Sequence, residues 1–98
     1  MSPTPRERAM LAGVVRLARM AGLRVPKVSL RVVAHLPNHH AYTEGRRITV
    51  ERKSLTAELL AHELAHVIAD QVVTEKVPAH NRFWGAVYAV LYQAVVEP

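Results

Sequence analysis

The chain has 98 residues, half of them hydrophobic, and it contains no cysteine. This length predicts a single domain over residues 1–98, and the missing thiols exclude disulfides and thiolate zinc sites within the chain. The formal net charge of +5 is compatible with attraction to nucleic acid. A solvated basic exterior explains this charge more simply, because no nucleic-acid motif accompanies it.

The N-terminal stretch MSPTPRERAM lacks a basic head followed by an apolar run, so no signal peptide is expected. The longest apolar run is also too short to cross a bilayer. We therefore expect a cytoplasmic protein without a membrane-spanning segment.

The first predicted element is a helix. Thr4 and Glu7 have the spacing of a capping box, and Pro5 occupies the first helical position. Apolar residues then recur at helical spacing as far as Ala21, and Gly22 offers a stop signal.

A small sheet is expected next. Residues 28–36 alternate and are rich in β-branched side chains, which predicts a strand. A short extended piece around residues 41–43, a turn at Glu44-Gly45 and a strand over Arg47–Glu51 follow. The economical interpretation is a mostly antiparallel three-stranded sheet.

The second half predicts two helices joined by a loop over residues 72–81. Thr56 is a plausible N-cap for a largely apolar, central helix that runs to about Asp70 or Gln71. A last helix begins near Asn81, and its packing residues are expected to be Phe83, Trp84, Val87, Val90 and Leu91. The fold class is therefore α+β.

The central helix contains His62-Glu63-x-x-His66. Residues four apart lie about 40° from each other around a helix, so both imidazoles can reach one ion at about 2.1 Å. Glu63 is turned about 60° beyond His66, which holds its carboxylate beside the ion as a candidate general base. The alternative is a chance match, but unpaired buried imidazoles would be costly and a cation removes that cost.

A hydrolytic zinc site needs a third protein ligand. His80, at the start of the last helix, is the strongest candidate because an antiparallel return of the chain would bring it back toward His66. Glu75 is a weaker one because it falls in the loop. Asp70 lies one turn after His66 and is better placed to orient an imidazole than to bind metal.

His62-Glu63-Leu64-Ala65-His66, followed by His80-x-x-Phe83-Trp84, resembles the zinc-peptidase cores of the SprT-like, WLM and YgjP-like families. The small size is similar to that of the minigluzincins, which are stand-alone peptidases. This resemblance covers roughly residues 41–92. It implies a minimal zincin fold of the gluzincin type, one zinc ion per chain and hydrolysis of peptide or protein substrates.

By the same resemblance, Ala41, Tyr42 and Thr43 are expected to form a substrate-binding strand edge; for Tyr42, ordinary packing in a small sheet is an equal alternative. The group that stabilises the oxyanion is left open among Arg82, Tyr88 and Tyr92. Minigluzincins can be blocked by their own chain, and the tail QAVVEP could act in this way.

The three remaining histidines, His35, His39 and His40, are interpreted as belonging to a solvated loop. Two other functions stay open: a zincin-fold module that binds metal without cutting anything, and a small basic nucleic-acid-binding protein with an accidental motif. The intact Glu63 argues against the first, because a purely structural metal site does not need that carboxylate.

Overall fold

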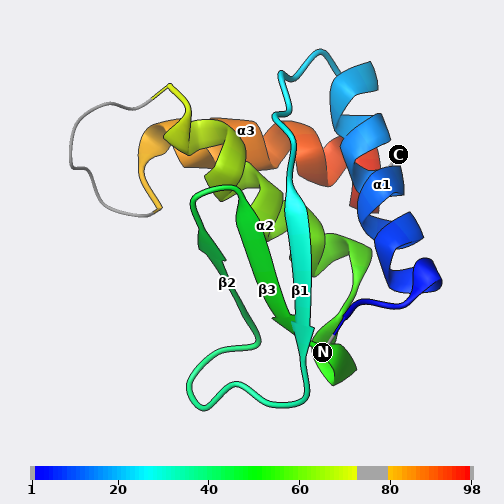
Figure 1. Cartoon of the computed structure of the whole chain (residues 1–98). Coiled ribbons are helices and arrows are strands. Elements are labelled where there is room, and N and C mark those ends of the chain that lie inside the picture. The colour runs from blue at the N-terminus through cyan, green and yellow to red at the C-terminus, as the bar shows by residue number, and fades with distance from the viewer. Residues whose placement is uncertain (1, 73–79, 98) are drawn as a thin grey trace.

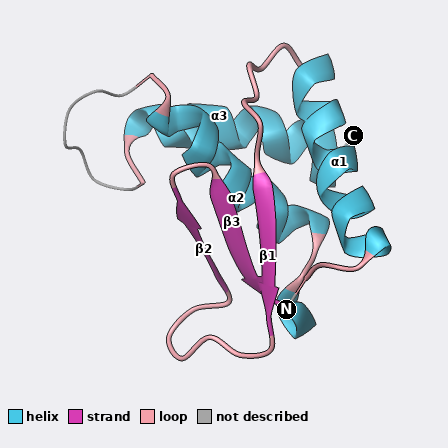
Figure 2. Cartoon of the chain, in the orientation of Figure 1, coloured by secondary structure: helices cyan, strands magenta, loops and turns pink. Residues whose placement is uncertain are grey.

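The computed structural model describes residues 2–72 and 80–97. Its α+β architecture confirms the predicted fold class. None of the helices in these two ranges has both the length and the apolarity that crossing a membrane requires. The elements follow one another as α1 (Pro5–Met20), β1 (Ser29–Val33), β2 (Ala41–Glu44), β3 (Arg47–Glu51), the 3₁₀ turn η1 (Arg52–Ser54), α2 (Ala57–Asp70), α3 (Arg82–Leu91) and its π-helical continuation η2 (Tyr92–Val96) (Figures 1 and 2).

Helix α1 begins with the predicted capping box. Thr4 Oγ1 accepts a hydrogen bond from the Glu7 amide at 3.1 Å, and the Thr4 amide donates to Glu7 Oε1 at 2.7 Å. The helix ends just before Gly22, whose φ of 92° suits a residue without a Cβ. Both ends of the predicted helix are therefore confirmed to within a residue.

Glu7 also fastens α1 to the rest of the fold. Its Oε2 accepts from Arg52 Nε at 2.9 Å, and Arg52 lies in η1, directly after β3. The hydrogen-bonded Arg52 guanidinium, together with the Thr4 amide, lowers the pKa of Glu7 from 4.5 to about 2. One carboxylate therefore caps a helix and joins two distant segments.

The sheet has the order β1-β3-β2. Strands β2 and β3 form the predicted antiparallel hairpin, with Gly45 at a φ of 60° in its turn. Strand β1 runs parallel to β3, so the expectation of a mostly antiparallel sheet was wrong for this pair. Residues 34–36 were predicted as strand, but β1 ends at Val33. Residues 34–40 carry the chain to the other edge of the sheet, where β2 begins. After the hairpin turn, β3 lies between β1 and β2 and runs in the same direction as β1.

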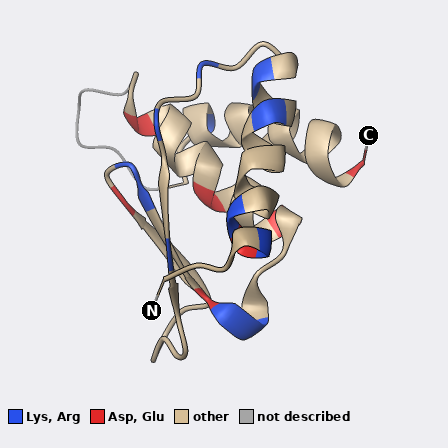
Figure 3. Cartoon of the chain, turned by 45° about the vertical axis from the view of Figure 1, so that its right-hand side comes forward, with Lys and Arg blue, Asp and Glu red and all other residues tan. Residues whose placement is uncertain are grey.

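The helices all lie on one face of the sheet (Figures 1 and 3). Val32, Ile48 and Val50 point into this interface and are fully buried. Helix α2 is the central helix, with contacts to α1, α3, β2 and β3. Eight of its 14 residues are buried, so its apolar surface extends well beyond the narrow stripe of an ordinary surface helix.

Helix α3 packs through only part of the predicted set. Val87 and Leu91 are buried and Trp84 is half-buried, whereas Phe83 and Val90 are exposed. The prediction was wrong for these two residues: each comes one position before a packed residue, Trp84 or Leu91, and so lies about 100° around the helix from it, at the margin of the packed face. Of the two aromatic residues at the start of α3, Trp84 is the one that packs against the core.

Candidate metal centre

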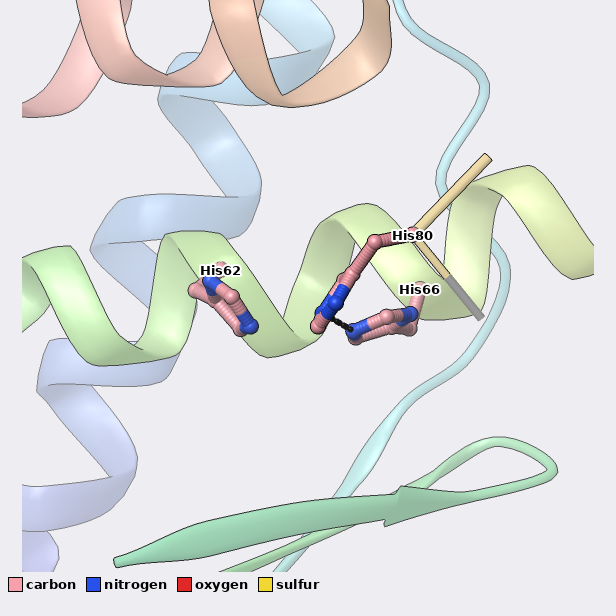
Figure 4. A group of neighbouring side chains, drawn as sticks. All are labelled: His62, His66 and His80. Carbon is pink, nitrogen blue, oxygen red and sulfur yellow. Dashed lines mark hydrogen bonds between the residues drawn. The ribbon is translucent and has the colours of Figure 1, made fainter. Parts of the chain in front are cut away.

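Three histidines from two separate segments meet at one point. His62 and His66 lie one turn apart on α2, and His80 lies just before α3 (Figure 4). One ring nitrogen of each lies within 4.8 Å of the other two, and the Nε2 atoms of His66 and His80 are 3.1 Å apart. Among the described residues, no other group of three or more histidines or carboxylates comes this close together.

The start of α3 brings His80 to this point. Asn81 Oδ1 accepts from the Trp84 amide at 2.9 Å, which caps the helix and sets the direction of its first turn. The Trp84 ring then lies against all three histidines, with centroid separations of 4.5 Å to His80, 5.0 Å to His62 and 5.2 Å to His66. A single indole therefore forms a common apolar wall for the three imidazoles.

The donor set suits a zinc ion. Burial lowers the pKa of His62 and of His66, which favours the neutral imidazole that a metal requires. The Nε2 atoms of His66 and His80 share a hydrogen bond of 3.1 Å. Two nitrogens on one tetrahedral zinc are about 3.3 Å apart, so an ion could replace the shared proton with little movement of either ring. Among the described residues, only these three imidazoles gather here, and three protein ligands are typical of catalytic zinc sites.

Glu63 lies beside the histidines. Its side chain is 7% exposed, and its Oε2 is 3.9 Å from His62 Nε2. The other carboxylate oxygen, Oε1, accepts a hydrogen bond from Thr43 Oγ1 at 2.8 Å. Thr43 was predicted at the substrate edge, but its contact with the candidate base was not foreseen, because it joins residues 20 positions apart in the sequence.

The centre opens into a cleft formed by two adjoining cavities of about 490 and 460 Å³. Both are lined by His39, Ala41, His62 and Glu63, and we call them together the metal-centre cleft. Strand β2, one of the two edge strands of the sheet, forms one side of it.

The predicted substrate edge lies in this wall. Ala41, Tyr42 and Thr43 all line the smaller cavity. The Tyr42 side chain points to the opposite face of β2 from Ala41 and Thr43, where its hydroxyl accepts a 3.5 Å hydrogen bond from Arg31. This hydrogen bond does not decide between packing and substrate contact for Tyr42, so substrate binding by these three residues stays a prediction.

Asp70 is exposed and lines the smaller cavity together with His66 and His80. None of the hydrogen bonds found among the described residues joins its carboxylate to an imidazole. Asp70 still acts on His66 through space, where its charge favours the protonated ring. Its orienting role stays a prediction, and Glu75 lies outside the described residues.

Of the three residues considered for the oxyanion, Tyr88 lines the larger cavity. Its ring lies 5.4 Å from that of His62 and stacks on Trp84 at 5.1 Å. Burial raises the pKa of Tyr88, so its phenol keeps the proton needed for hydrogen-bond donation. Tyr92 and Arg82 line neither cavity of the cleft.

The C-terminal tail, considered as a self-inhibitory segment, takes another course. Residues Tyr92–Val96 continue α3 as a π-helical turn, and Val95 packs against the hydrophobic core. No residue from 93 to 97 lines either cavity of the cleft. In this structure, the described part of the tail leaves the cleft open.

The loop histidines are closer to the site than the sequence indicated. All three are exposed, but His39 lines both cavities. His35 and His40 flank the buried Glu51, with Nδ1–carboxylate distances of 3.3 and 3.6 Å. Hydrogen bonds from the Leu36 amide at 3.0 Å and from the Ser54 hydroxyl also hold this carboxylate and lower its pKa. Sequence spacing gave no signal for these contacts, because they depend on the course of residues 34–40.

The charge of the cleft differs from that of the chain. Three carboxylates, those of Glu58, Glu63 and Asp70, line it. None of the lysines and arginines in the described residues does so. The lysines and arginines of the two described ranges therefore lie outside the cleft.

Comparison with known proteins gives no relative: the chain matches no protein-family profile, no curated protein and no solved structure. The function must therefore be argued from the site itself.

Proposed function

We propose that this protein is a zinc-dependent peptidase, similar in its histidine pattern to the SprT-like, WLM and YgjP-like families and in its minimal size to the minigluzincins. One observation carries the proposal: the His62, His66 and His80 nitrogens gather within 4.8 Å of one another in the wall of an open cleft. A buried carboxylate, that of Glu63, lies beside them. A purely structural metal site would need neither the cleft nor the carboxylate.

His62, His66 and His80 would hold one zinc ion. When bound, zinc supplies a Lewis acid that polarises the scissile carbonyl and makes a water molecule more acidic. The three imidazoles are suited to this because burial disfavours protonation of two of them and Trp84 contacts all three.

Glu63 acts as the general base. It accepts the proton of the attacking water and later delivers it to the leaving amine. The hydrogen bond from Thr43 occupies Oε1, which leaves Oε2, on the His62 side, free to take the proton. Thr43 is thus a positioning residue, since it acts through Glu63.

Two further groups would contact the substrate. Tyr88 donates a hydrogen bond to the carbonyl oxygen as negative charge develops on it, the task of an oxyanion-stabilising donor. The open edge of β2 receives an extended peptide through main-chain hydrogen bonds. Residues Ala41 and Thr43 on this edge lie next to Glu63 in the same cavity.

The decisive measurement is zinc content by inductively coupled plasma mass spectrometry. We expect one zinc per wild-type chain and strongly reduced zinc in His80→Ala. His39→Ala is the matched control, since it removes another exposed histidine of the same cleft and should leave zinc bound. Hydrolysis of a quenched-fluorescence peptide library is measured on the same preparations.

The outcomes separate the three functions. Zinc bound by wild type and lost in His80→Ala, together with hydrolysis of library peptides by wild type, supports the peptidase. Zinc without hydrolysis of any library peptide would favour a silent metal-binding module. Absence of zinc combined with steeply salt-dependent DNA affinity would favour a nucleic-acid-binding protein.

A further inference from the structure

A second groove lies at the opposite edge of the sheet from the metal-centre cleft. Figure 1 shows α1 alongside β1, the edge strand on that side. A cavity of about 500 Å³ lies between α1, residues 26–28 and the start of β1; we call it the α1–β1 groove. None of its lining residues lines the cleft, so the two surfaces are separate.

The groove has an apolar floor. Leu11 and Val15 contribute from α1, and Val28 and Leu30 from the other wall. Leu11 is buried in the core, and the other three are only partly buried. A ligand in the groove would therefore cover apolar surface that residues 2–72 and 80–97 leave accessible.

The rim of the groove is positively charged. Arg8, Arg19 and Lys27 line it, and no carboxylate does. Arg8 and Arg19 donate to neutral main-chain carbonyls, those of Pro3 at 2.7 Å and Val25 at 3.1 Å. These bonds hold both guanidinium groups in place but leave their charge uncompensated, because no carboxylate among the described residues pairs with any of the three cations.

The positive rim extends past the groove. A neighbouring cavity shares Lys27, Val28 and Ser29 with it and adds Arg46 and Arg47. Its one carboxylate, that of Glu44, already pairs with Arg47 at 3.7 Å. Figure 3 shows basic residues along α1 and on the segment that leads to the sheet.

We propose that the α1–β1 groove binds an acidic peptide segment in which apolar side chains alternate with Asp or Glu. The apolar side chains cover the floor, and the carboxylates pair with Arg8, Arg19 and Lys27. Nucleic acid fits less well, since neither cavity presents an aromatic ring on which a base could stack. A segment bound here leaves the metal-centre cleft free, and the proposal does not depend on the peptidase function.

The test uses the full chain with Glu63→Gln, so that the cleft cannot cleave the probe. The probe is a short fluorescein-labelled peptide of alternating Glu and Leu, and binding is followed by fluorescence anisotropy at about 0.15 M salt. Three comparison probes are a Glu/Ser peptide, a Lys/Leu peptide and a DNA duplex. We expect saturable binding of the Glu/Leu peptide alone.

Charge reversal locates the binding site. Arg8→Glu with Arg19→Glu should weaken binding by about tenfold or more, since two favourable charge pairs become repulsive. Arg6→Glu with Arg16→Glu is the matched control: both residues are exposed on α1 and outside the groove, and the change in net charge is the same. If circular dichroism shows that the first variant is unfolded, Lys27→Glu replaces it, with an expected weakening of about threefold.

Four results would overturn the proposal. The first is no binding of the Glu/Leu peptide, and the second is binding of the Glu/Ser peptide as tight as that of the Glu/Leu peptide. The third is that both double variants weaken binding of the Glu/Leu peptide equally. The fourth is that DNA binds more tightly than the Glu/Leu peptide and loses this binding in Arg8→Glu with Arg19→Glu. The last result would assign the surface to nucleic acid.

Discussion

The two edges of the sheet carry opposite chemistry. At the β2 edge, imidazoles and carboxylates line the metal-centre cleft, and no described lysine or arginine reaches it. At the β1 edge, guanidinium and ammonium groups surround an apolar floor, and no carboxylate lines the α1–β1 groove. Strand β3 separates the two edges.

This difference shows how little a net charge says about a site. The chain carries a formal charge of +5. The ionisable residues that line the metal-centre cleft are nevertheless carboxylates, histidines and two tyrosines, Tyr42 and Tyr88. A lysine or arginine beside the histidines would repel a metal cation bound there, and none of the described ones lines the cleft. The two surfaces should therefore respond to different substitutions.

The largest effect is expected from Glu63→Gln. Loss of the general base should lower the rate of peptide hydrolysis by about 10³-fold, while zinc content and peptide binding at the α1–β1 groove stay at wild-type levels. Initial rates, zinc content and anisotropy are measured on one preparation. Undiminished hydrolysis would remove Glu63 from the mechanism.

Tyr88→Phe tests the other side of the cleft. The variant keeps the ring that stacks on Trp84 but removes the hydroxyl. We expect kcat to fall by about 10²-fold with little change in KM, because the hydrogen bond matters only as charge develops. A rise in KM at unchanged kcat would instead assign Tyr88 to ground-state binding.

Thr43→Val should have a smaller effect. The substitution keeps the shape of the side chain and removes the hydrogen bond to Glu63 Oε1, so the carboxylate is less firmly oriented. We expect kcat to fall by about tenfold with zinc retained, and Thr43→Ser should restore most of the rate. If Ser rescues no better than Val, Thr43 contributes packing and not orientation.

The smallest effect is expected on the stability of the fold, at the ion pair by which Arg52, just after β3, holds Glu7 of α1. The pKa of Glu7 lies near 2 in the folded protein, below its ordinary 4.5. Its ionised form therefore stabilises the fold above about pH 4.5, and this contribution is lost as the pH falls toward 2. In thermal melts of the metal-free protein, wild type should be more stable than Glu7→Gln at pH 7 and approach it near pH 2.

Glutamine can still accept the capping-box hydrogen bond from Thr4, so the Glu7→Gln comparison isolates the charge. Parallel pH profiles of the two proteins would mean that the ion pair with Arg52 adds no net stability.

Local sequence patterns predicted most of the elements. The capping box at Thr4, the N-cap at Thr56 and the turn at Gly45 are signals read within a few residues, and the structure confirms each of them. The helical spacing of His62 and His66 also follows from the period of a single helix. Side chains at positions 83 and 90 were misplaced because the rotation of a helix against its neighbours is not encoded in hydrophobicity alone.

Tertiary structure decided the rest. The parallel pairing of β1 with β3 and the hydrogen bond between Thr43 and Glu63 each join residues at least 18 positions apart, and neither was expected from the sequence. The approach of His80 to His66 was expected, but the 3.1 Å between their Nε2 atoms comes from the tertiary structure. The separation of the acidic cleft from the basic groove also depends on the tertiary structure, because acidic and basic residues are interspersed along the chain. The physical reason is the range of the interactions: backbone capping and periodicity act within a turn or two, whereas the direction of a returning strand or helix is fixed by packing against a shared core.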